Sequence, residues 1–295
     1  MDRHGAFVRF LMVATGTRRY AELGTYHGRS LFSAAQAARH ITPAPECIGI
    51  DSWVGDRHTG QYPQQVGARM HRVAEAAFPT SVVTVQATFD DARPLFDDGS
   101  VDLLLIDGLH TYDAVRHDME TWRGVLSGRG IVMLHDSVST NPDFAVGRYV
   151  AELRAEFPTL EIRHTEGLAV VFVGHVDTPL RTLLESLAQQ PELGDAFEAL
   201  TLAMGTTSAS LGQADHIIDM LARALDPTDH VAGPDLQALM VSRAERLSRH
   251  GAITAGTEVW VAHGRRARFL SRADRLWVRM HAAARWLSRR RPRAT

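Results

Sequence analysis

One run of almost uninterrupted apolar residues most constrains what this chain can fold into: Val101-Asp102-Leu103-Leu104-Leu105-Ile106, followed by Asp107. A strand with one face in water alternates apolar and polar residues, whereas such a run is typical of a strand buried on both faces. Strands of that kind occur in parallel sheets that carry helices on each face. The run therefore predicts an α/β chain in which strands and helices alternate.

The first 175 residues alternate in the way that this architecture requires. Strands are predicted at 20–23, 47–51, 82–86, 101–107 and 130–135, with a closing pair at 161–163 and 168–173. Helices are predicted at 6–16, 30–39, 65–77, 113–126 and 146–157. The expected fold is a doubly wound, Rossmann-like, mostly parallel sheet in one domain, residues 1–175.

A helical extension is predicted over residues 176–295, where the strand pattern stops. Helices are predicted at 178–190, 193–204, 214–225 and 235–249, with Pro and Gly at the breaks. Residues 265–295 hold 11 Arg and a single acidic residue, and their apolar residues recur at helical spacing. Three interpretations of this Arg-rich amphipathic helix stay open: packing on the chain itself or on a second subunit of a homo-oligomer, peripheral attachment to a membrane, or binding to phosphates.

Composition excludes several function classes. The net charge is only -2, so the chain outside the basic tail is acidic, which argues against nucleic acid as the substrate. The chain contains no lysine, which excludes a Schiff base and a phosphate-loop lysine. The single Cys47 cannot form an internal disulfide, which fits a reducing compartment, and we expect it to be a buried apolar residue. With no secretory leader and no apolar run of about 18 residues, we expect a cytoplasmic protein.

Ionisable residues lie at the ends of the predicted strands: Glu22, Asp51, Asp107, His135 and Asp136. A parallel sheet binds its ligand at the carboxyl ends of its strands, near the point where the strand order reverses. These side chains are therefore expected to face one site.

The first motif is a glycine turn, Glu22-Leu23-Gly24-Thr25-Tyr26-His27-Gly28-Arg29-Ser30. Glycines allow the backbone to turn tightly and to approach a ligand, and Glu22 can accept from an amine or a hydroxyl. Asp51, after the second strand, could bind both hydroxyls of a ribose. The turn lacks the third glycine of the dinucleotide-binding fingerprint, so a purely structural turn remains the alternative.

The second motif combines Asp107 and His110 with His135-Asp136 at the end of the next strand. Two carboxylates and an imidazole suit a divalent metal, and His110 could be a general base because an unperturbed histidine titrates near neutrality. The alternative is that both aspartates cap turns and both histidines lie on the surface. The loop that follows Asp51, residues 53–62, is either a substrate lid or a plain surface loop.

These motifs resemble class I S-adenosylmethionine (SAM)-dependent methyltransferases. The resemblance covers about residues 18–174, is most specific at 107–118, and is nearest to macrolide-sugar O-methyltransferases and cephalosporin-hydroxylase-type proteins. It rests on the glycine turn, Asp51-Ser52-Trp53-Val54-Gly55-Asp56, the stretch Ile106–Asp118 and Leu134-His135-Asp136.

The resemblance implies a role for each matching position. Glu22 and Gly24, with Gly28 and Ser30 in the same turn, would hold the methionine end of SAM; Asp51 would hold the ribose; Thr88 would lie beside the adenine; and Asp107 would border the cofactor. In the metal-dependent sugar enzymes, acids at the places of Asp107, His135 and Asp136 bind Mg²⁺, and the histidine at the place of His110 is the base. Because His135 stands where those enzymes carry Glu, the metal is Mg²⁺, a softer divalent ion, or absent.

The function expected is therefore a SAM-dependent O-methyltransferase that acts on a hydroxyl of a sugar or polyol, in a small natural product or a glycan. Two alternatives remain: a SAM-fold enzyme of another reaction class, and a non-catalytic binding module that keeps the fold.

Overall fold

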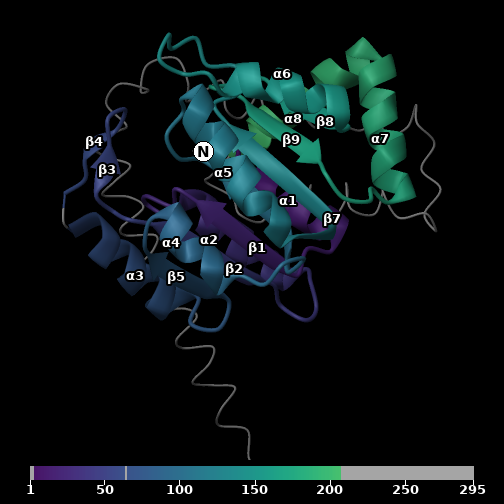
Figure 1. Ribbon diagram of the computed structural model, residues 1–295. Coiled ribbons are helices and arrows are strands. Elements are labelled where there is room, and N and C mark those ends of the chain that lie inside the picture. The colour runs from purple at the N-terminus through teal and green to yellow at the C-terminus, as the bar shows by residue number, and fades with distance from the viewer. Residues whose placement is uncertain (1–2, 64, 207–295) are drawn as a thin grey trace, which may run out of the picture.

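The computed structural model describes residues 3–63 and 65–206, which form a seven-stranded sheet between two layers of helices (Figure 1). The strand order is β5-β2-β1-β6-β7-β9-β8. The strands are β1 (Arg19–Leu23), β2 (Glu46–Asp51), β5 (Val82–Gln86), β6 (Val101–Ile106), β7 (Leu126–His135), β8 (Thr159–Ile162) and β9 (Leu168–Phe172). The first five in sequence pair in parallel, whereas β9 runs antiparallel to both β7 and β8. The predicted doubly wound, mostly parallel sheet is confirmed.

Helices cover both faces of the sheet, as the apolar run required. They are α1 (Gly5–Thr15), α2 (Arg29–Ala35), α3 (Gln65–Ala77), α4 (Phe89–Ala92), α5 (Tyr112–Trp122), α6 (Val146–Glu156), α7 (Thr178–Gln189) and α8 (Pro191–Thr206), with 3₁₀ turns η1 (Gln36–Arg39), η2 (Arg93–Leu95) and η3 (Arg123–Val125). Side chains of α1, α2, α3, α7 and α8 share one apolar core, and those of α4, α5 and α6 share the other.

Strand β6 shows why both cores exist. Leu103 and Leu105 belong to the core under α1, whereas Leu104 and Ile106 belong to the core under α5 and α6. Successive residues of a strand point to opposite faces of the sheet. Because helices cover both faces, all four side chains are buried. A central strand of this kind leaves only its ends free to carry polar chemistry.

The first two helices of the predicted extension pack on the domain. The ring of Phe197 in α8 meets the ring of Phe7 in α1 edge-on, with centroids 6.1 Å apart. Leu183 and Leu187 of α7 join the same core. The division at residue 175/176 stays a prediction, and the helices predicted at 214–225 and 235–249 and in the basic tail lie outside the described residues. No helix within residues 3–63 and 65–206 is long and apolar enough to cross a membrane.

Some short elements escaped the sequence prediction. The loop 53–62 folds into a small hairpin of β3 (Gly55–Asp56) and β4 (Gly60–Gln61), and α4 has only four residues. Elements this short carry too little apolar periodicity to be seen. Strand β7 also begins at Leu126, earlier than predicted, because Leu126 pairs with Val101 before the register shifts.

The strand order reverses between β1 and β6. From β1 the chain moves outward to β2 and β5, then returns to place β6 on the other side of β1. The loops that leave β1 and β6 therefore start at the carboxyl ends of the strands where the strand order reverses, the place where sheets of this kind bind their ligands. The glycine turn follows β1, and Asp107 follows β6.

Candidate active site

Backbone hydrogen bonds join the loops at this edge of the sheet. The amide of Asp107 donates to the carbonyl of Leu23 at 2.9 Å, and the amide of Gly24 donates to Ile50 at 2.9 Å. Gly24 has φ 91°, and a β-carbon there would overlap the backbone carbonyl of Asp107. The turn after β1 is therefore in direct contact with the start of the Asp107 loop, and only glycine permits that approach.

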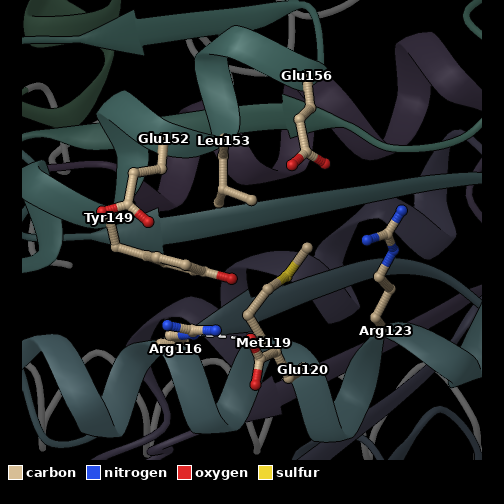
Figure 2. Close-up of a pocket in the computed structure, with 8 residues that line it drawn as sticks. All are labelled: Arg116, Met119, Glu120, Arg123, Tyr149, Glu152, Leu153 and Glu156. Atoms are coloured by element: carbon tan, nitrogen blue, oxygen red, sulfur yellow. Dashed lines mark hydrogen bonds and ion pairs between the residues drawn. The ribbon is translucent and has the colours of Figure 1, made fainter.

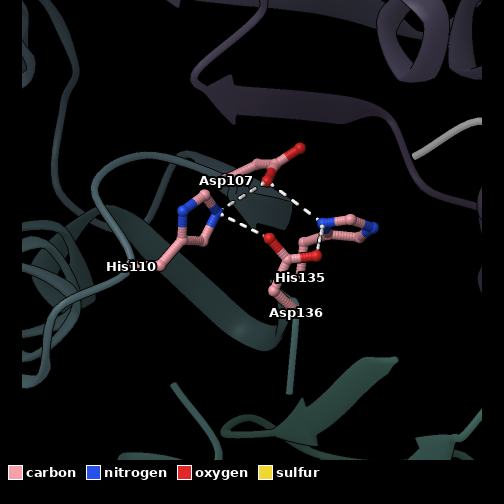
Figure 3. Close-up of side chains that lie close together, drawn as sticks. All are labelled: Asp107, His110, His135 and Asp136. Atoms are coloured by element: carbon pink, nitrogen blue, oxygen red, sulfur yellow. Dashed lines mark hydrogen bonds and ion pairs between the residues drawn. The ribbon is translucent and has the colours of Figure 1, made fainter. Parts of the chain in front are cut away.

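Four side chains converge beside this contact: Asp107, His110, His135 and Asp136, called here the quartet (Figure 3). His110 Nε2 lies 2.9 Å from Asp136 Oδ2 and 3.4 Å from Asp107 Oδ1. His135 Nδ1 lies 2.6 Å from Asp136 Oδ1 and 3.2 Å from Asp107 Oδ1. Each aspartate thus contacts both histidines. The alternative, in which the two aspartates only cap turns and the two histidines lie on the surface, does not describe this arrangement.

The quartet is an ion-pair network shielded from water. The side chains of His135 and Asp136 are 9% and 10% exposed, and those of His110 and Asp107 are 11% and 20% exposed. Burial disfavours charge on every member, but hydrogen bonds and ion pairs to the aspartates outweigh it and raise the pKa of His110 and of His135 to about 9. Against the same opposing burial, the histidines lower the pKa of Asp136 to about 2 and hold that of Asp107 well below its usual range. At neutral pH, two imidazolium ions therefore balance two carboxylates.

Backbone strain marks the loops around the site. Asp136, Tyr26 and Trp53 have φ of 62°, 47° and 52°, in the left-handed region that side chains other than Gly, Asn and Asp rarely adopt. Such residues cost roughly 1–3 kcal/mol each and cluster at ligand-binding sites. The amide of Asp136 is fixed in this conformation by a 3.0 Å bond to the carbonyl of Gly167.

Glu22 lies behind the glycine turn in the sheet. Its side chain is fully buried, and the Tyr20 hydroxyl donates to its Oε2 at 2.6 Å. Burial raises the pKa of Glu22 to about 8, so the group is mainly protonated at neutral pH. Gly28 (φ 72°) precedes α2, where a β-carbon would press against the ring of Phe32, and Ser30 is buried in the first turn of that helix.

Asp51 ties two loops together. Its Oδ2 accepts from the amide of Tyr26 at 2.8 Å, and its Oδ1 accepts from the amide of Trp53 at 2.6 Å. Burial raises the pKa of Asp51 despite these two donors. Each carboxylate oxygen keeps a lone pair for a further donor, so binding of a ribose stays a prediction that this geometry permits.

Thr88 lies at the carboxyl end of β5, where it caps α4. Its hydroxyl accepts from the amide of Asp91 at 3.2 Å and donates to the Asp91 carboxylate at 2.7 Å. Contact of Thr88 with an adenine stays a prediction.

Sequence reasoning missed two rings that lie over His110. Phe144 stacks on the His110 ring with centroids 4.3 Å apart, and the ring of His58 lies 4.9 Å from Phe144 and 5.9 Å from His110. The signal for His58 was the polar, aromatic loop that contains it, whereas nothing in the sequence around Phe144 pointed to the site. On the opposite side, buried His4 of the N-terminal segment meets His135 edge-on at 5.3 Å.

A cavity of about 200 Å³ between α5 and α6 lies apart from the quartet (Figure 2). It is lined by Arg116, Met119, Glu120, Arg123, Tyr149, Glu152, Leu153 and Glu156. Arg116 is already paired with Glu120 at 2.7 Å, and the Tyr112 hydroxyl donates to Glu152 at 2.9 Å. Arg116, Glu120 and Glu152 thus already have partners, and we place the functional site at the quartet, where four ionisable side chains converge.

Known proteins resemble the chain in sequence and in fold. An uncharacterized protein of Sinorhizobium fredii, y4gI, is 36% identical over 204 residues, which are 68% of this chain and 22% of the relative, so the chain spans about a fifth of that protein's length. The SAH-bound methyltransferase PaMTH1 of Podospora anserina has a TM-score of 0.46 at 16% identity, over 59% of this chain and 78% of its own. The O-methyltransferase TomG of Streptomyces achromogenes, in complex with SAM, has a TM-score of 0.45 at 17% identity, over 58% and 80%.

One family model covers the site. Residues 21–137 match the model of a methyltransferase domain. The match begins inside β1 and ends just after Asp136, so it contains the glycine turn, Asp51, Thr88 and the quartet. Every predicted site residue thus lies within the stretch of this chain that matches the model of a methyltransferase domain.

Proposed function

We propose that the protein is a SAM-dependent O-methyltransferase whose acceptor is a hydroxyl of a sugar or polyol. One observation carries the proposal: the acid–imidazole quartet adjoins the glycine turn that is expected to hold SAM, through the contact of Gly24 with Asp107. A proton-accepting group and a methyl donor bound by the glycine turn would share this edge of the sheet, which supports the proposal.

The reaction needs little more than alignment and deprotonation. As the oxygen–carbon bond forms, the sulfur–carbon bond of SAM breaks, and its electron pair stays on sulfur to give S-adenosylhomocysteine (SAH). Holding donor and acceptor in line can supply roughly 7–11 kcal/mol of the barrier. The proton of the hydroxyl passes to Nδ1 of His110, because Nε2 faces the two aspartates and carries the proton that it donates to them.

His110 must be neutral to accept that proton. Its pKa of about 9 in the ion-pair network means that it is protonated at pH 7 when nothing else occupies the quartet. A cation or ligand that binds the two carboxylates in place of the histidines would lower the pKa of His110 towards the working range of a base. The proposal therefore predicts that activity rises with pH until His110 is deprotonated.

The quartet also fits a divalent cation. One ligand atom from each member lies within 4.8 Å of all the others, close to the separation of about 4.0–4.4 Å that an ion with bonds of about 2.0–2.2 Å can span. Asp107, His135 and Asp136 would hold the ion, which leaves His110 free. Bound there, a cation would stabilise a deprotonated hydroxyl of the acceptor. The mixture of oxygen and nitrogen donors accommodates Mg²⁺ less well than a softer divalent ion.

Methyl transfer from labelled SAM tests the proposal. A panel of glycosides and polyols is incubated with the protein, with and without divalent metals and with excess chelator. We expect labelled product from at least one of them. Calorimetry of the same protein with SAM and SAH gives an independent reading. A folded protein that binds neither SAM nor SAH at millimolar concentration is not a SAM-dependent enzyme. Full activity in excess chelator would show that the reaction requires no metal.

Properties outside the described residues remain proposals. Self-association as a homo-oligomer and peripheral membrane binding both depend on the basic helix that the sequence predicts at 265–295. Comparison of the full chain with a form that ends before residue 265 tests both, by light scattering and by sedimentation with anionic vesicles. A cytoplasmic location is likewise a proposal, which fluorescence microscopy of the tagged full chain checks.

A further inference from the structure

The hairpin of β3 and β4 holds His58 in a fixed position. Asp56 Oδ1 accepts from the amides of His58 at 2.7 Å and Thr59 at 2.8 Å, which closes the tip. At the base, Gly55 has φ 87°, and a β-carbon there would overlap the carbonyl of Gly60. The tip is therefore a defined turn that aims the His58 side chain in one direction.

That direction is towards the quartet. The ring of His58 lies 28° from the plane of Phe144 and 15° from the plane of His110, so the three rings are nearly parallel. Phe144 is tied in turn to the His110 loop, because the amide of the next residue, Ala145, donates to the carbonyl of His110 at 2.8 Å. His58 and Phe144 together form two aromatic surfaces over the proposed base.

The imidazole of His58 is an unusual choice for such a contact. Both of its ring nitrogens are buried, and no described residue forms a hydrogen bond with either. A buried polar group without a partner costs about 1–3 kcal/mol, which a phenyl ring in the same place would avoid. A site that binds a hydroxylated ligand gives such a group its partner.

The base of the hairpin is joined to the predicted cofactor turn. Asp51 accepts from the amides of Tyr26 and Trp53, and the indole Nε1 of Trp53 donates to the carbonyl of Tyr26 at 2.9 Å. The hairpin thus runs from the predicted cofactor turn to the quartet. Its tip carries His58 beside His110.

We propose that His58 is an acceptor-binding residue. A ring compound with neighbouring hydroxyl groups enters beneath the hairpin, stacks against the faces of His58 and Phe144, and exchanges hydrogen bonds with the ring nitrogens of His58. One hydroxyl is thereby presented to His110. This assignment rests on the proposed methyltransferase function. It adds that His58 and Phe144 select the acceptor.

The test measures binding rather than turnover. The probes are methyl α-D-mannopyranoside, myo-inositol and catechol, three compounds with neighbouring hydroxyls. Their binding to the full chain in the presence of SAH is followed by saturation-transfer NMR, and SAH binding alone is followed by calorimetry. The variants are His58→Phe, which keeps a ring without nitrogens, and His58→Gln, which keeps a polar head. His175→Phe is the matched control, since His175 is 72% exposed and outside the site.

We expect at least one probe to bind the wild type and the His175→Phe protein equally, and to bind His58→Phe about tenfold more weakly, as for the loss of one hydrogen bond. His58→Gln should recover part of that loss, the SAH affinity should stay unchanged in all variants, and the melting temperature of His58→Phe should rise because the phenyl ring avoids the unpartnered nitrogens. Equal probe binding by wild type and His58→Phe overturns the assignment, as does failure of all probes to bind a wild type that binds SAH. Probe binding that depends on His58 in a protein that binds no SAH supports the acceptor site and refutes methyl transfer instead.

Discussion

Two groups of buried histidines meet at His135, and their pKa values shift in opposite directions. In the quartet, His110 and His135 share two carboxylates, and the pKa of each rises to about 9. On the other side of His135, His4 stacks on His164 at 4.7 Å, away from those carboxylates. Burial, with the nearby His135 and His164, lowers the pKa of His4 to about 2, and burial together with Arg3 lowers that of His164 to about 4.

The charge of each of these histidines therefore depends on whether a carboxylate lies beside the ring, and not on burial alone. Burial by itself acts to lower the pKa of all four rings. In the quartet, carboxylates within hydrogen-bond reach overcome this effect and raise the pKa of His110 and His135. The neutral pair of His4 and His164 therefore packs against the charged quartet at His135. The predictions below test this contrast, from the largest effect to the smallest.

The largest effect is expected from His110→Ala. Loss of the proton acceptor should lower the rate of methyl transfer by about 10²- to 10⁴-fold, because that is the usual contribution of general base catalysis. SAM affinity should not change, since His110 lies on the acceptor side. Labelled SAM and calorimetry measure the two quantities. His117→Ala, which removes an exposed histidine paired with Asp90, is the control. Full activity in His110→Ala would show that another group takes the proton.

The second prediction separates the two histidine groups by the pH dependence of stability, measured by urea unfolding with chelator present. The pKa of His110 is raised on folding from 6.5 to about 9, so its contribution is fully present below pH 6.5 and is lost as the pH rises through about 9. The pKa of His4 is lowered from 6.5 to about 2, so its contribution is present above pH 6.5 and is lost as the pH falls towards 2.

Each group therefore has its own variant and its own pH window. Asp136→Asn should destabilise the fold at pH 6 by about 3–5 kcal/mol, as for removal of one partner of a buried ion pair, and should flatten the loss between pH 6.5 and 9. His4→Leu should instead flatten the acid side below pH 6.5. If His4→Leu changes the loss between pH 6.5 and 9, the contrast between the two groups is wrong; the low pKa of Asp136 means that Asp136→Asn also changes stability below about pH 4.

The third prediction concerns Asp51, a carboxylate that accepts hydrogen bonds from the backbone amides of Tyr26 and Trp53. Its pKa is raised by burial, unlike those of Asp107 and Asp136, because its partners are amides instead of imidazolium ions. Asp51→Asn should weaken SAH binding by about 10- to 150-fold, equivalent to a hydrogen bond to a charged group of 1.5–3 kcal/mol. Calorimetry measures the affinity, with Asp56→Asn in the same region as the comparison. An unchanged affinity would remove Asp51 from the cofactor site.

The smallest effect is expected at Cys47, a buried thiol in the core under α1. Burial raises the pKa of Cys47 far above its ordinary value, so the native thiol should not react with an aromatic disulfide reagent at pH 8, whereas the unfolded chain should react at once. Cys47→Ala should cost about 1 kcal/mol of stability, the usual effect of a small loss of packing, and leave methyl transfer unchanged. Rapid labelling of the folded protein would contradict this picture.

The sequence alone determined the sheet and the edge that carries chemistry. Apolar periodicity is local, so the run 101–106 was enough to predict a central strand with helices on both faces. It also placed Asp107 and Asp136 at strand ends, and parallel strands bring such ends together. The quartet follows from those two facts once β6 and β7 are neighbours.

Only the tertiary structure decided which histidines carry charge and what covers the site. His4, His110 and His135 have the same intrinsic pKa, and their opposite states come from partners that the chain supplies from distant positions. The placement of His58 and Phe144 over His110 likewise depends on a short hairpin and a loop with no apolar period of their own. Distance through space sets electrostatic and stacking energies, and a linear pattern of residues does not contain those distances.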